Sequence, residues 1–396
     1  MCLSPVLNPD RMKALRSVAK VRKPVRGAML AAVLLLARGG GEAHAQASTP
    51  ALRGTIDLAI GSVDETREAY IFGAVSSLAL LEDGRILVAD HSTNDVRVFG
   101  PDGRHQFTIG RAGAGPGDLR TPCCLAIDRQ GRLWVRDVGN RRYSIFEVGP
   151  SKVTFVRTIR SYVASPRALN DRVQWDDRGR IVDLGQLPND VMQRAFLDST
   201  GNASWDTLRS PPAESLSVMR VPRQVEGGMS IYYFYQPHGP GALRAHGPRG
   251  ETAEAVSSTY AVSWLDAAGR RIVLIQRDMT SPELSARERR EAGRELDDVA
   301  RQAGVARGAL PFDVPARKPP LRDLGFDLDG RLWIERTVPD GQPREADVFE
   351  RDGRRVRVMT WPAHVSLRHR TVRGRTAVGV AIDSLGTSTI VRLRFR

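Results

Sequence analysis

Cysteine is almost absent from this sequence, which holds only Cys2, Cys123 and Cys124. So few cysteines exclude a fold held together by several disulfides, and none lies in the paired spacing of a zinc site. Cys123 and Cys124 are neighbours at the start of an apolar stretch. A strained disulfide between them is one alternative. We favour two buried thiols, because free cysteine behaves as a small apolar residue.

The sequence also lacks an apolar run long enough to cross a bilayer, since a spanning helix needs about 20 residues. The run over residues 28–37 follows a basic segment at 12–23 and precedes a small-x-small cleavage site at 43–45. This order is typical of a secretory signal. We therefore expect residues 1–45 to be a signal peptide with an N-terminal extension, and the mature protein to be exported to the periplasm or the extracellular space without a membrane span. A short membrane anchor is the alternative.

Lysine is scarce, and after residue 45 only Lys152 and Lys318 occur. The net charge is +14, but the many arginines alternate with carboxylates instead of forming one stripe. A nucleic-acid surface concentrates its basic residues on one face. We therefore expect no nucleic-acid partner, and we expect the protein to be a monomer.

Glycine and proline are plentiful, with 37 and 24 residues. Four segments repeat an apolar strand, a turn that ends in Gly-Arg, and a second apolar strand, and their glycines are Gly84, Gly131, Gly179 and Gly330. Each segment predicts a β-hairpin whose glycine takes a positive φ. Gly84 and Gly131 are 47 residues apart, and a period in the forties fits a four-stranded propeller blade. Trp134 and Trp333 occupy the same position after two of these turns, so both should be buried.

A second, outer hairpin recurs within the blades, at residues 96–109 and 347–358. The Gly-rich segment 109–122 resembles the link between blades in NHL-repeat propellers, and residues 88–99 and 135–142 resemble the core of that repeat. The resemblance to bacterial exported propellers of this type implies an all-β fold of six four-stranded antiparallel blades. It implies no particular activity, because propellers host many functions.

The length of the chain gives the number of blades. Residues 46–396 are expected to form a single propeller domain, interrupted by a helical insertion at about 281–320. The remaining length and the observed period favour six blades, and seven is the alternative. The last blade, residues 365–396, is one strand short. Residues 52–60 alternate apolar and polar side chains and should supply the missing strand, which would close the ring.

The insertion carries the signals of one amphipathic helix. Ser285 and Glu288 fit a capping box, and Gly304 can end the helix. A lid or partner surface is one interpretation. We favour a helix packed on the rim of the ring, because a single apolar face explains the pattern.

Candidate chemistry is sparse, since no nucleophile elbow, phosphate loop or zinc-protease motif is present. Four residues at strand ends are candidates for ligand binding at the channel mouth: Asp90, His91, Arg136 and Asp137. The alternative, which we favour for the two aspartates, is that they hold turns through bonds from side chain to backbone. His238 and His246 lie in a loop rich in glycine and proline and fit no metal motif. No catalytic residue, metal ligand or cofactor is therefore assigned.

Two functions stay open. The first is an exported binding or scaffold propeller that engages a protein or a small ligand on one face without catalysis. The alternative is a hydrolase or lyase that depends on calcium or zinc, as in the gluconolactonase-like propellers and the amidating lyase that resemble this fold. We favour binding, with residues 211–250, rich in Pro, Gly and Tyr, as the contact surface. The alternative is that residues 231–235 are simply the inner strand of the fourth blade.

Overall fold

The computed structural model describes residues 50–61, 66–161, 173–176, 178–186, 191–209, 217–225, 228–383 and 385–396. The chain divides into two units, residues 1–47 and 48–396, and only the second is described below. The expected signal peptide lies outside the described residues. In the described part of the chain, no helix is long and apolar enough to cross a membrane.

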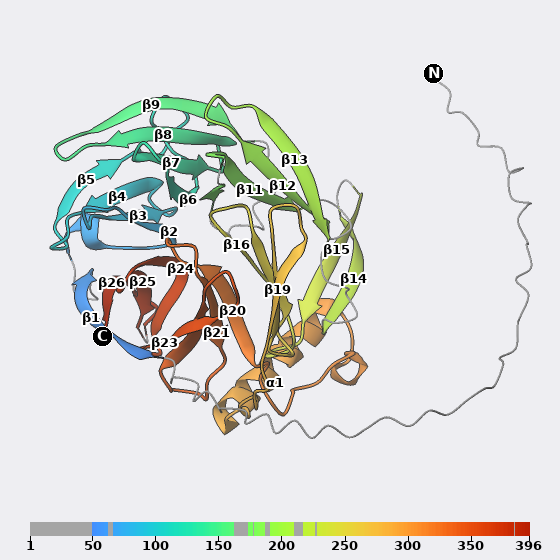
Figure 1. Ribbon diagram of the computed structural model, residues 1–396. Coiled ribbons are helices and arrows are strands. Elements are labelled where there is room, and N and C mark those ends of the chain that lie inside the picture. Colours follow the sequence, from blue (N-terminus) through green and yellow to red (C-terminus); the bar gives the residue numbers. More distant parts are fainter. Residues whose placement is uncertain are drawn as a thin grey trace, which may run out of the picture. The chain divides into compact units, whose positions relative to one another are not determined.

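The second unit is a six-bladed β-propeller (Figure 1), as the sequence predicted. Blade 1 consists of β2 (Val75–Leu80), β3 (Ile86–Asp90), β4 (Asp95–Phe99) and β5 (His105–Ile109). Blade 2 consists of β6 (Pro122–Ile127), β7 (Arg132–Asp137), β8 (Arg142–Val148) and β9 (Val153–Arg160). Blade 3 consists of β10 (Gln174–Trp175), β11 (Ile181–Gln186), β12 (Val191–Leu197) and β13 (Ala203–Arg209).

The second half of the ring repeats this order. Blade 4 consists of β16 (Ala242–His246), β17 (Thr252–Val256), β18 (Ala261–Leu265) and β19 (Arg271–Gln276). Blade 5 consists of β20 (Leu321–Phe326), β21 (Leu332–Arg336), β22 (Arg344–Phe349) and β23 (Arg355–Trp361). Blade 6 consists of β24 (Val365–Arg373), β25 (Thr376–Ile382), β26 (Ser388–Phe395) and β1 (Ala51–Ile60). In blades 1 to 5 the first strand in the sequence lies innermost. In blade 6 the innermost strand is β24, and β1, from the N-terminal part of the chain, is the outermost strand.

Strand β1 closes the ring. Its residues Gly54–Ile60 pair antiparallel with β26, and its first residues, Ala51–Arg53, pair parallel with β23 of blade 5. Asp57 adds ion pairs to Arg392 at 2.9 Å and Arg394 at 3.0 Å. The structure therefore confirms that the N-terminal strand completes the last blade.

The repeated turn follows from one hydrogen-bond pattern. Asp128 accepts hydrogen bonds from the backbone N–H groups of Gln130 and Arg132, at 3.0 and 2.8 Å. Asp176 in blade 3 and Asp327 in blade 5 bind the two equivalent N–H groups of their own turns. The glycine that follows each aspartate has a φ of 73–82°, which costs a residue with a side chain far more than it costs glycine.

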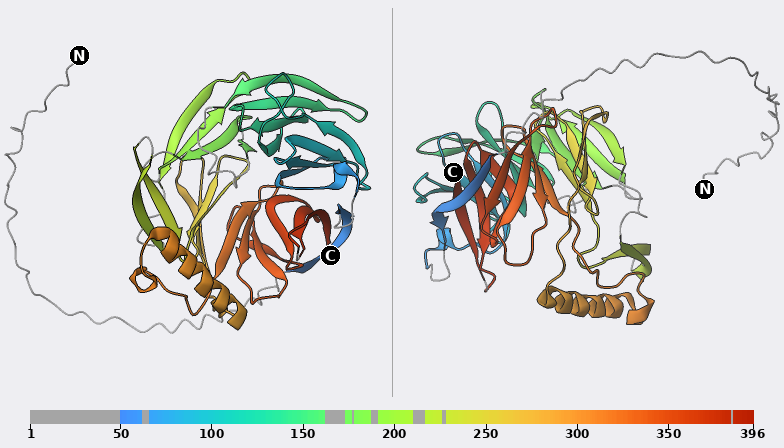
Figure 2. Two further views of the ribbon diagram at one scale, coloured as in Figure 1. Left: turned by 180° about the vertical axis from the view of Figure 1, so that it is seen from behind. Right: turned by 60° about the horizontal axis from the view of Figure 1, so that its bottom comes forward.

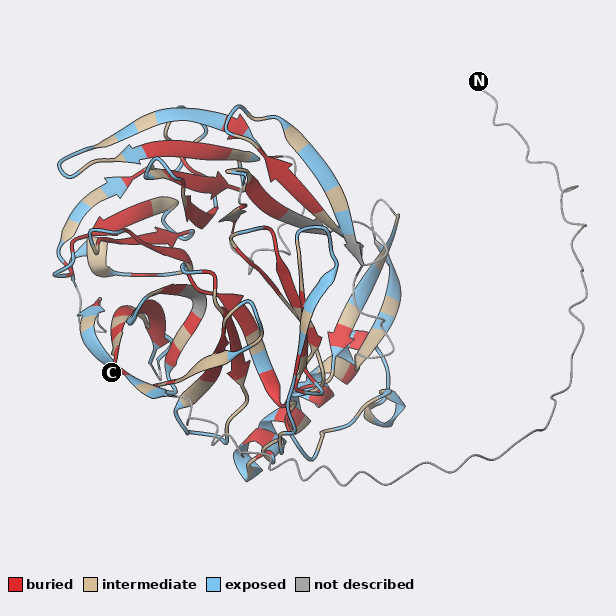
Figure 3. Ribbon diagram, in the orientation of Figure 1, coloured by how far each residue is buried: buried red, intermediate tan, exposed pale blue. Residues whose placement is uncertain are grey.

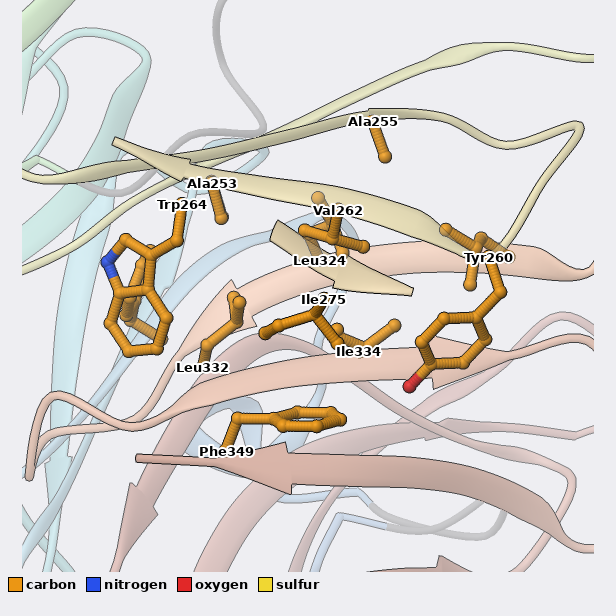
Figure 4. Close-up of a cluster of buried hydrophobic side chains, with 13 residues drawn as sticks. Ala253, Ala255, Tyr260, Val262, Trp264, Ile275, Leu324, Leu332, Ile334 and Phe349 are labelled. Carbon is orange, nitrogen blue, oxygen red and sulfur yellow. The ribbon is translucent and has the colours of Figure 1, made fainter. Parts of the chain in front are cut away.

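The core lies between neighbouring blades. Trp134 and Trp333 are buried, and each donates its indole N–H to the aspartate of its own turn, at 3.0 and 3.1 Å. Figure 4 shows the packing of blade 4 against blade 5, where Trp264 and Tyr260 face the side chains of blade 5 strands. In blade 2 the inner strands β6 and β7 are almost entirely buried, whereas the outermost strand β9 is mostly exposed (Figure 3).

One α-helix, two 3-10 helices and one hairpin of the described chain lie outside the six blades. Helix α1 (Ala286–Ala303) begins at Ser285, where a capping box with Glu288 is present, and ends at Gly304 with a φ of 73°. The short 3-10 helices are η1 (Glu68–Tyr70) and η5 (Arg307–Ala309). Strands β14 (Val218–Val225) and β15 (Gly228–Tyr235) form a separate two-stranded hairpin. Residues 231–235 are therefore not the inner strand of blade 4, which is β16.

A disulfide joins Cys123 and Cys124, so the expectation of two free thiols was wrong. Both cysteines are buried, as expected. Neighbouring side chains on a regular strand point to opposite faces. Cys124 departs from this geometry with a φ of 52°, and the pairing of β6 with β7 shifts register at the same place. The strand irregularity brings the two sulfur atoms together.

Candidate functional site

One cavity is lined by residues of all six blades, from inner strands and from the turns that follow them. It has a volume of about 680 Å³. Its wall comes from the ends of the inner strands and from the turns that follow them in blades 1 and 2. Blades 3 to 6 contribute Trp175, Pro248, Phe326 and Thr371, among others. We call this cavity the central pocket.

The inner wall of the central pocket is apolar. Leu80, Ala126, Val173 and Phe326 line it and are each less than 10% exposed. Trp175 also lines it and is half-buried, with its ring edge-on to Trp134 at a centroid distance of 5.1 Å. Such a wall takes an apolar body out of water, at about 25 cal/mol for each Å² of apolar surface buried.

The two buried carboxylates in the wall, those of Asp128 and Asp327, already have hydrogen-bond partners within the fold. Asp128 accepts from two backbone N–H groups, from Arg132 at 2.7 Å and from Trp134. Asp327 accepts from two backbone N–H groups and from Trp333. Burial raises the pKa of Asp327 above its usual value, and these hydrogen bonds offset the rise only in part.

The rim of the central pocket carries polar side chains that differ between blades. Glu82 in blade 1 forms an ion pair with Arg373 in blade 6 at 3.1 Å. Blade 2 contributes the exposed side chains of Arg129 and Gln130, and blade 5 contributes Leu328, which is 43% exposed. The turn aspartate recurs in blades 2, 3 and 5, as Asp128, Asp176 and Asp327, whereas the two residues between the aspartate and its glycine differ from blade to blade.

The candidates Asp90 and His91 lie at the opposite end of blade 1. Asp90 pairs with Val75 at the start of β2, whereas the central pocket begins at Leu78. Asp90 is fully buried and accepts hydrogen bonds from the N–H groups of Gly73, Ala74 and Ser92. Burial alone would raise its pKa, but the hydrogen bonds from Ser92, Gly73 and Ala74 outweigh burial and hold the pKa below its usual value. The side chain of His91 is exposed.

Asp137 and Arg136 occupy the corresponding position in blade 2. Asp137 is fully buried and accepts from the N–H of Arg120 at 2.7 Å, from Asn140 at 2.7 Å and from Arg142 at 2.9 Å. These contacts hold the turn between two strands and the link from blade 1, which agrees with the turn-holding role that the sequence favoured.

Arg136 points into the junction between blades 2 and 3. It forms a buried ion pair with Asp183 at 3.3 Å, and Tyr143 donates its hydroxyl hydrogen to the same carboxylate. Burial, and then the charge of Asp183, raises the pKa of Tyr143 well above its usual value. None of the four candidate residues lines the central pocket. A ligand-binding role for them stays a prediction.

His238 and His246, both expected in a loop, differ in environment, and the expectation was wrong for His246, which ends strand β16. His238 is exposed, whereas His246 is buried at the end of β16 with Nδ1 3.3 Å from the hydroxyl oxygen of Thr252. Across the described ranges, no three His, Cys, Asp or Glu side chains form a group that could hold a metal ion.

Sequence reasoning missed the central pocket, although its signal was present. The turns that end in Gly-Arg indicated hairpins, and positions that vary within them, such as Glu82 and Arg129, form the rim of the pocket. Their variation between blades could have marked them, because residues that repeat serve the turn and residues that differ do not.

A family described as a 6-bladed β-propeller matches residues 64–146, which is well under half of the chain. The finer resemblance to NHL-repeat propellers stays a prediction. No curated protein matches the sequence.

Several solved structures are similar to this chain at low identity. A catalytically inactive virginiamycin B lyase from Staphylococcus aureus, solved with quinupristin, is 10% identical over 85% of this chain and 98% of its own, with a TM-score of 0.41. A Bacteroides fragilis protein described as exported is 9% identical over 87% and 95%, with a TM-score of 0.44. A Xanthomonas campestris gluconolactonase is 13% identical over 86% and 98%, with a TM-score of 0.32. At these identities the likeness concerns the fold alone.

Proposed function

We propose that this protein binds a small amphipathic organic molecule in the central pocket and releases it unchanged. The observation that carries the proposal is the convergence of all six blades on one cavity of about 680 Å³. Pockets of about 300–1,000 Å³ hold drug-sized ligands, and most are apolar with a few polar groups that fix orientation. The apolar wall would take the body of the ligand, and the rim residues Glu82, Arg129 and Arg373 would contact its polar end.

The hydrogen bonds of the two buried carboxylates support binding rather than catalysis by these two groups. A general base or a nucleophile needs a lone pair that can reach the substrate. In the central pocket, Asp128 accepts four hydrogen bonds from its own turn, and Asp327 accepts three. Using either group in a reaction would take it away from a turn that it stabilises.

We propose that the binding takes place outside the cytoplasm. The support is the order of basic, apolar and small residues within positions 1–45. A binding protein of this kind would capture its ligand in the periplasm or outside the cell.

The test is calorimetric titration with 2-naphthoate and with cholate, two amphipathic molecules of different size. We expect one of them to bind at a single site with a Kd below about 1 mM, which corresponds to a binding free energy of at least about 4 kcal/mol. Ala126→Leu, which narrows the pocket, should weaken binding at least tenfold. Trp205→Phe changes an exposed tryptophan that does not line the pocket and should leave binding unchanged. Equal binding by the parent and Ala126→Leu would refute the pocket as the site.

The same samples test the enzymatic alternative. Metal content is measured on the purified protein, and a panel of lactones and esters is assayed for turnover before and after chelation. Stoichiometric calcium or zinc, with turnover that chelation abolishes, would replace the binding proposal with a metal-dependent hydrolase or lyase. Ligand recovered unchanged from the complex would support binding.

A further inference from the structure

The β14–β15 hairpin exposes apolar side chains to an unusual degree. Met229 is 66% exposed, Ile231 is 50% exposed and Tyr235 is 59% exposed. Side chains alternate between the two faces of a strand, so these three lie on one face. By the register of the hairpin, Pro222 on β14 lies on the same face, opposite Ile231. An exposed apolar cluster of this kind marks a contact surface.

The hairpin is held in place by the insertion. Arg223 donates to the carbonyl oxygen of Gln302 in α1, and Gln236 donates to that of Asp313 at 2.6 Å. Figure 2 shows the hairpin and α1 side by side on the same side of the ring. Phe234, whose side chain points to the face opposite Ile231, is buried. The insertion therefore supports the hairpin and leaves the apolar face outward.

The backbone pattern of the hairpin leaves β15 with an open edge. The N–H of Gln236 donates to the carbonyl oxygen of Ser217 at 3.0 Å, so this pair is hydrogen-bonded. Such pairs alternate with pairs whose N–H and C=O groups point away from the partner strand. By this alternation, the backbone groups of Met229, Ile231 and Tyr233 point away from β14.

No other described strand pairs with β15, and no hydrogen bond joins these outward groups to another described residue. The position of Pro222 agrees with the alternation, because its missing N–H falls on the outer edge of β14. The two edges therefore differ. The edge of β14 lacks a donor, whereas that of β15 presents a full row of donors and acceptors.

The two strands of the hairpin carry charge of one sign, and the segment that joins them contains Glu226. The described residues 217–225 and 228–236 contain two arginines and no aspartate or glutamate. The guanidinium of Arg220 lies over the ring of Tyr233, with its carbon 5.6 Å from the centroid, and that of Arg223 lies 5.2 Å from the centroid of Tyr232. Positive charge therefore lies over both faces of β15.

We propose that β15 binds an extended, acidic segment of a partner polypeptide as an added strand. The open edge would supply main-chain hydrogen bonds, and the exposed apolar face would pack against alternate side chains of the segment. Arg220 and Arg223, which lie on opposite faces of the hairpin, would favour carboxylates in the segment. A second copy of this chain is a poorer occupant, because pairing two β15 edges would bring four arginines together. This site is independent of the central pocket.

The test uses fluorescence anisotropy with the full chain and two labelled ten-residue peptides, one alternating valine and glutamate and one alternating valine and lysine. We expect saturable binding of the glutamate peptide, at least tenfold weaker binding of the lysine peptide, and weaker binding at 0.5 M salt. Ile231→Pro removes one outward N–H but no bond within the hairpin, so it should weaken binding at least tenfold. Leu385→Ser removes an apolar side chain that is 77% exposed elsewhere and should have no effect.

If circular dichroism and Tm show that Ile231→Pro alters the fold, a second pair of variants tests the proposal. Ile231→Ser keeps the N–H but removes the apolar side chain, whereas Arg220→Gln removes one positive charge. Each of these two variants should weaken binding of the glutamate peptide threefold or more. Equal binding of the two peptides would overturn the proposal, as would glutamate-peptide binding that none of these variants weakens. A dimer that forms with rising concentration and is abolished by Ile231→Pro would assign the edge to a second copy instead. Sedimentation with phosphatidylglycerol vesicles, without peptide binding, would assign the surface to lipid.

Discussion

His246 makes the stability of the protein depend on pH in a predictable way. The imidazole is buried at the end of β16, and in the described structure its Nε2 has no hydrogen-bond partner. Burial, and then the charges of Arg244 and Arg194, lowers its pKa from 6.5 to about 3. The folded protein therefore holds His246 neutral at a pH at which the unfolded chain protonates it.

The sign follows from proton linkage, because the unfolded state binds more protons below pH 6.5. The contribution of neutral His246 to the free energy of unfolding is fully present above pH 6.5, and it is lost as the pH falls from 6.5 toward 3. Each pKa unit corresponds to about 1.4 kcal/mol. His246 alone should therefore cost about 2 kcal/mol of unfolding free energy at pH 5, and about 4 kcal/mol near pH 3.

The assay is urea unfolding at pH 7.5 and pH 5.0 of the parent and of His246→Phe. Other groups also titrate in this range, so the measured quantity is the difference between the two proteins in their loss of free energy. The parent should lose about 2 kcal/mol more than His246→Phe. His364→Phe, at an exposed histidine, should lose as much as the parent. An identical pH dependence in the parent and His246→Phe would show that the imidazole is not held neutral.

Three further predictions concern the fold and export. Trp333→Ala should lower the free energy of unfolding by about 3–5 kcal/mol, as for other buried aromatics, whereas Trp205→Ala, at an exposed site, should change it by less than about 0.5 kcal/mol; equal losses in denaturant titrations would contradict the burial argument. Deletion of residues 46–61 removes β1 and opens blades 5 and 6, so it should cost several kcal/mol, and a deletion variant that melts like the parent would count against ring closure. N-terminal sequencing of exported protein should begin near Gln46, and exported protein that retains residues 1–45 would refute signal cleavage.

The blades could be predicted from the sequence because their signals are local. A turn aspartate, a glycine with positive φ and an apolar strand lie within ten residues, and Trp134 and Trp333 follow at a fixed offset. The capping box of α1 is equally local. The pairing of β1 with β26 was predictable for another reason, since the last blade lacked a strand and one alternating segment was left to supply it.

The central pocket could not be predicted in the same way. Its wall joins Leu80, Ala126, Val173 and Phe326, which are far apart in the sequence and meet only when the ring closes. The hairpin was missed for a related reason. Residues 231–235 favour a strand in any sheet, and propensity alone does not say whether that strand joins blade 4 or a sheet of its own.

Blade 4 shows what the repeated turn requires. Where blade 2 has Asp128 and Arg132, blade 4 has Gly247 and Glu251. The carboxylate of Glu251 accepts from the N–H of Arg249 at 2.7 Å, so it binds the N–H that corresponds to the one Asp128 binds in blade 2. A Cβ at position 247 would lie 2.6 Å from the side chain of Glu251, which explains why glycine stands there.

In blade 4 the carboxylate that accepts this hydrogen bond comes after the turn, whereas in blade 2 it comes before the turn. Blades 2 and 4 thus supply an acceptor for this N–H group from different positions of the turn. The departure of blade 4 from the repeat is thus a second solution to a structural requirement and is no sign of a functional site. Function in this ring should be sought where side chains differ between blades and no turn needs them, which is the case for the rim of the central pocket and for the outward face of β15.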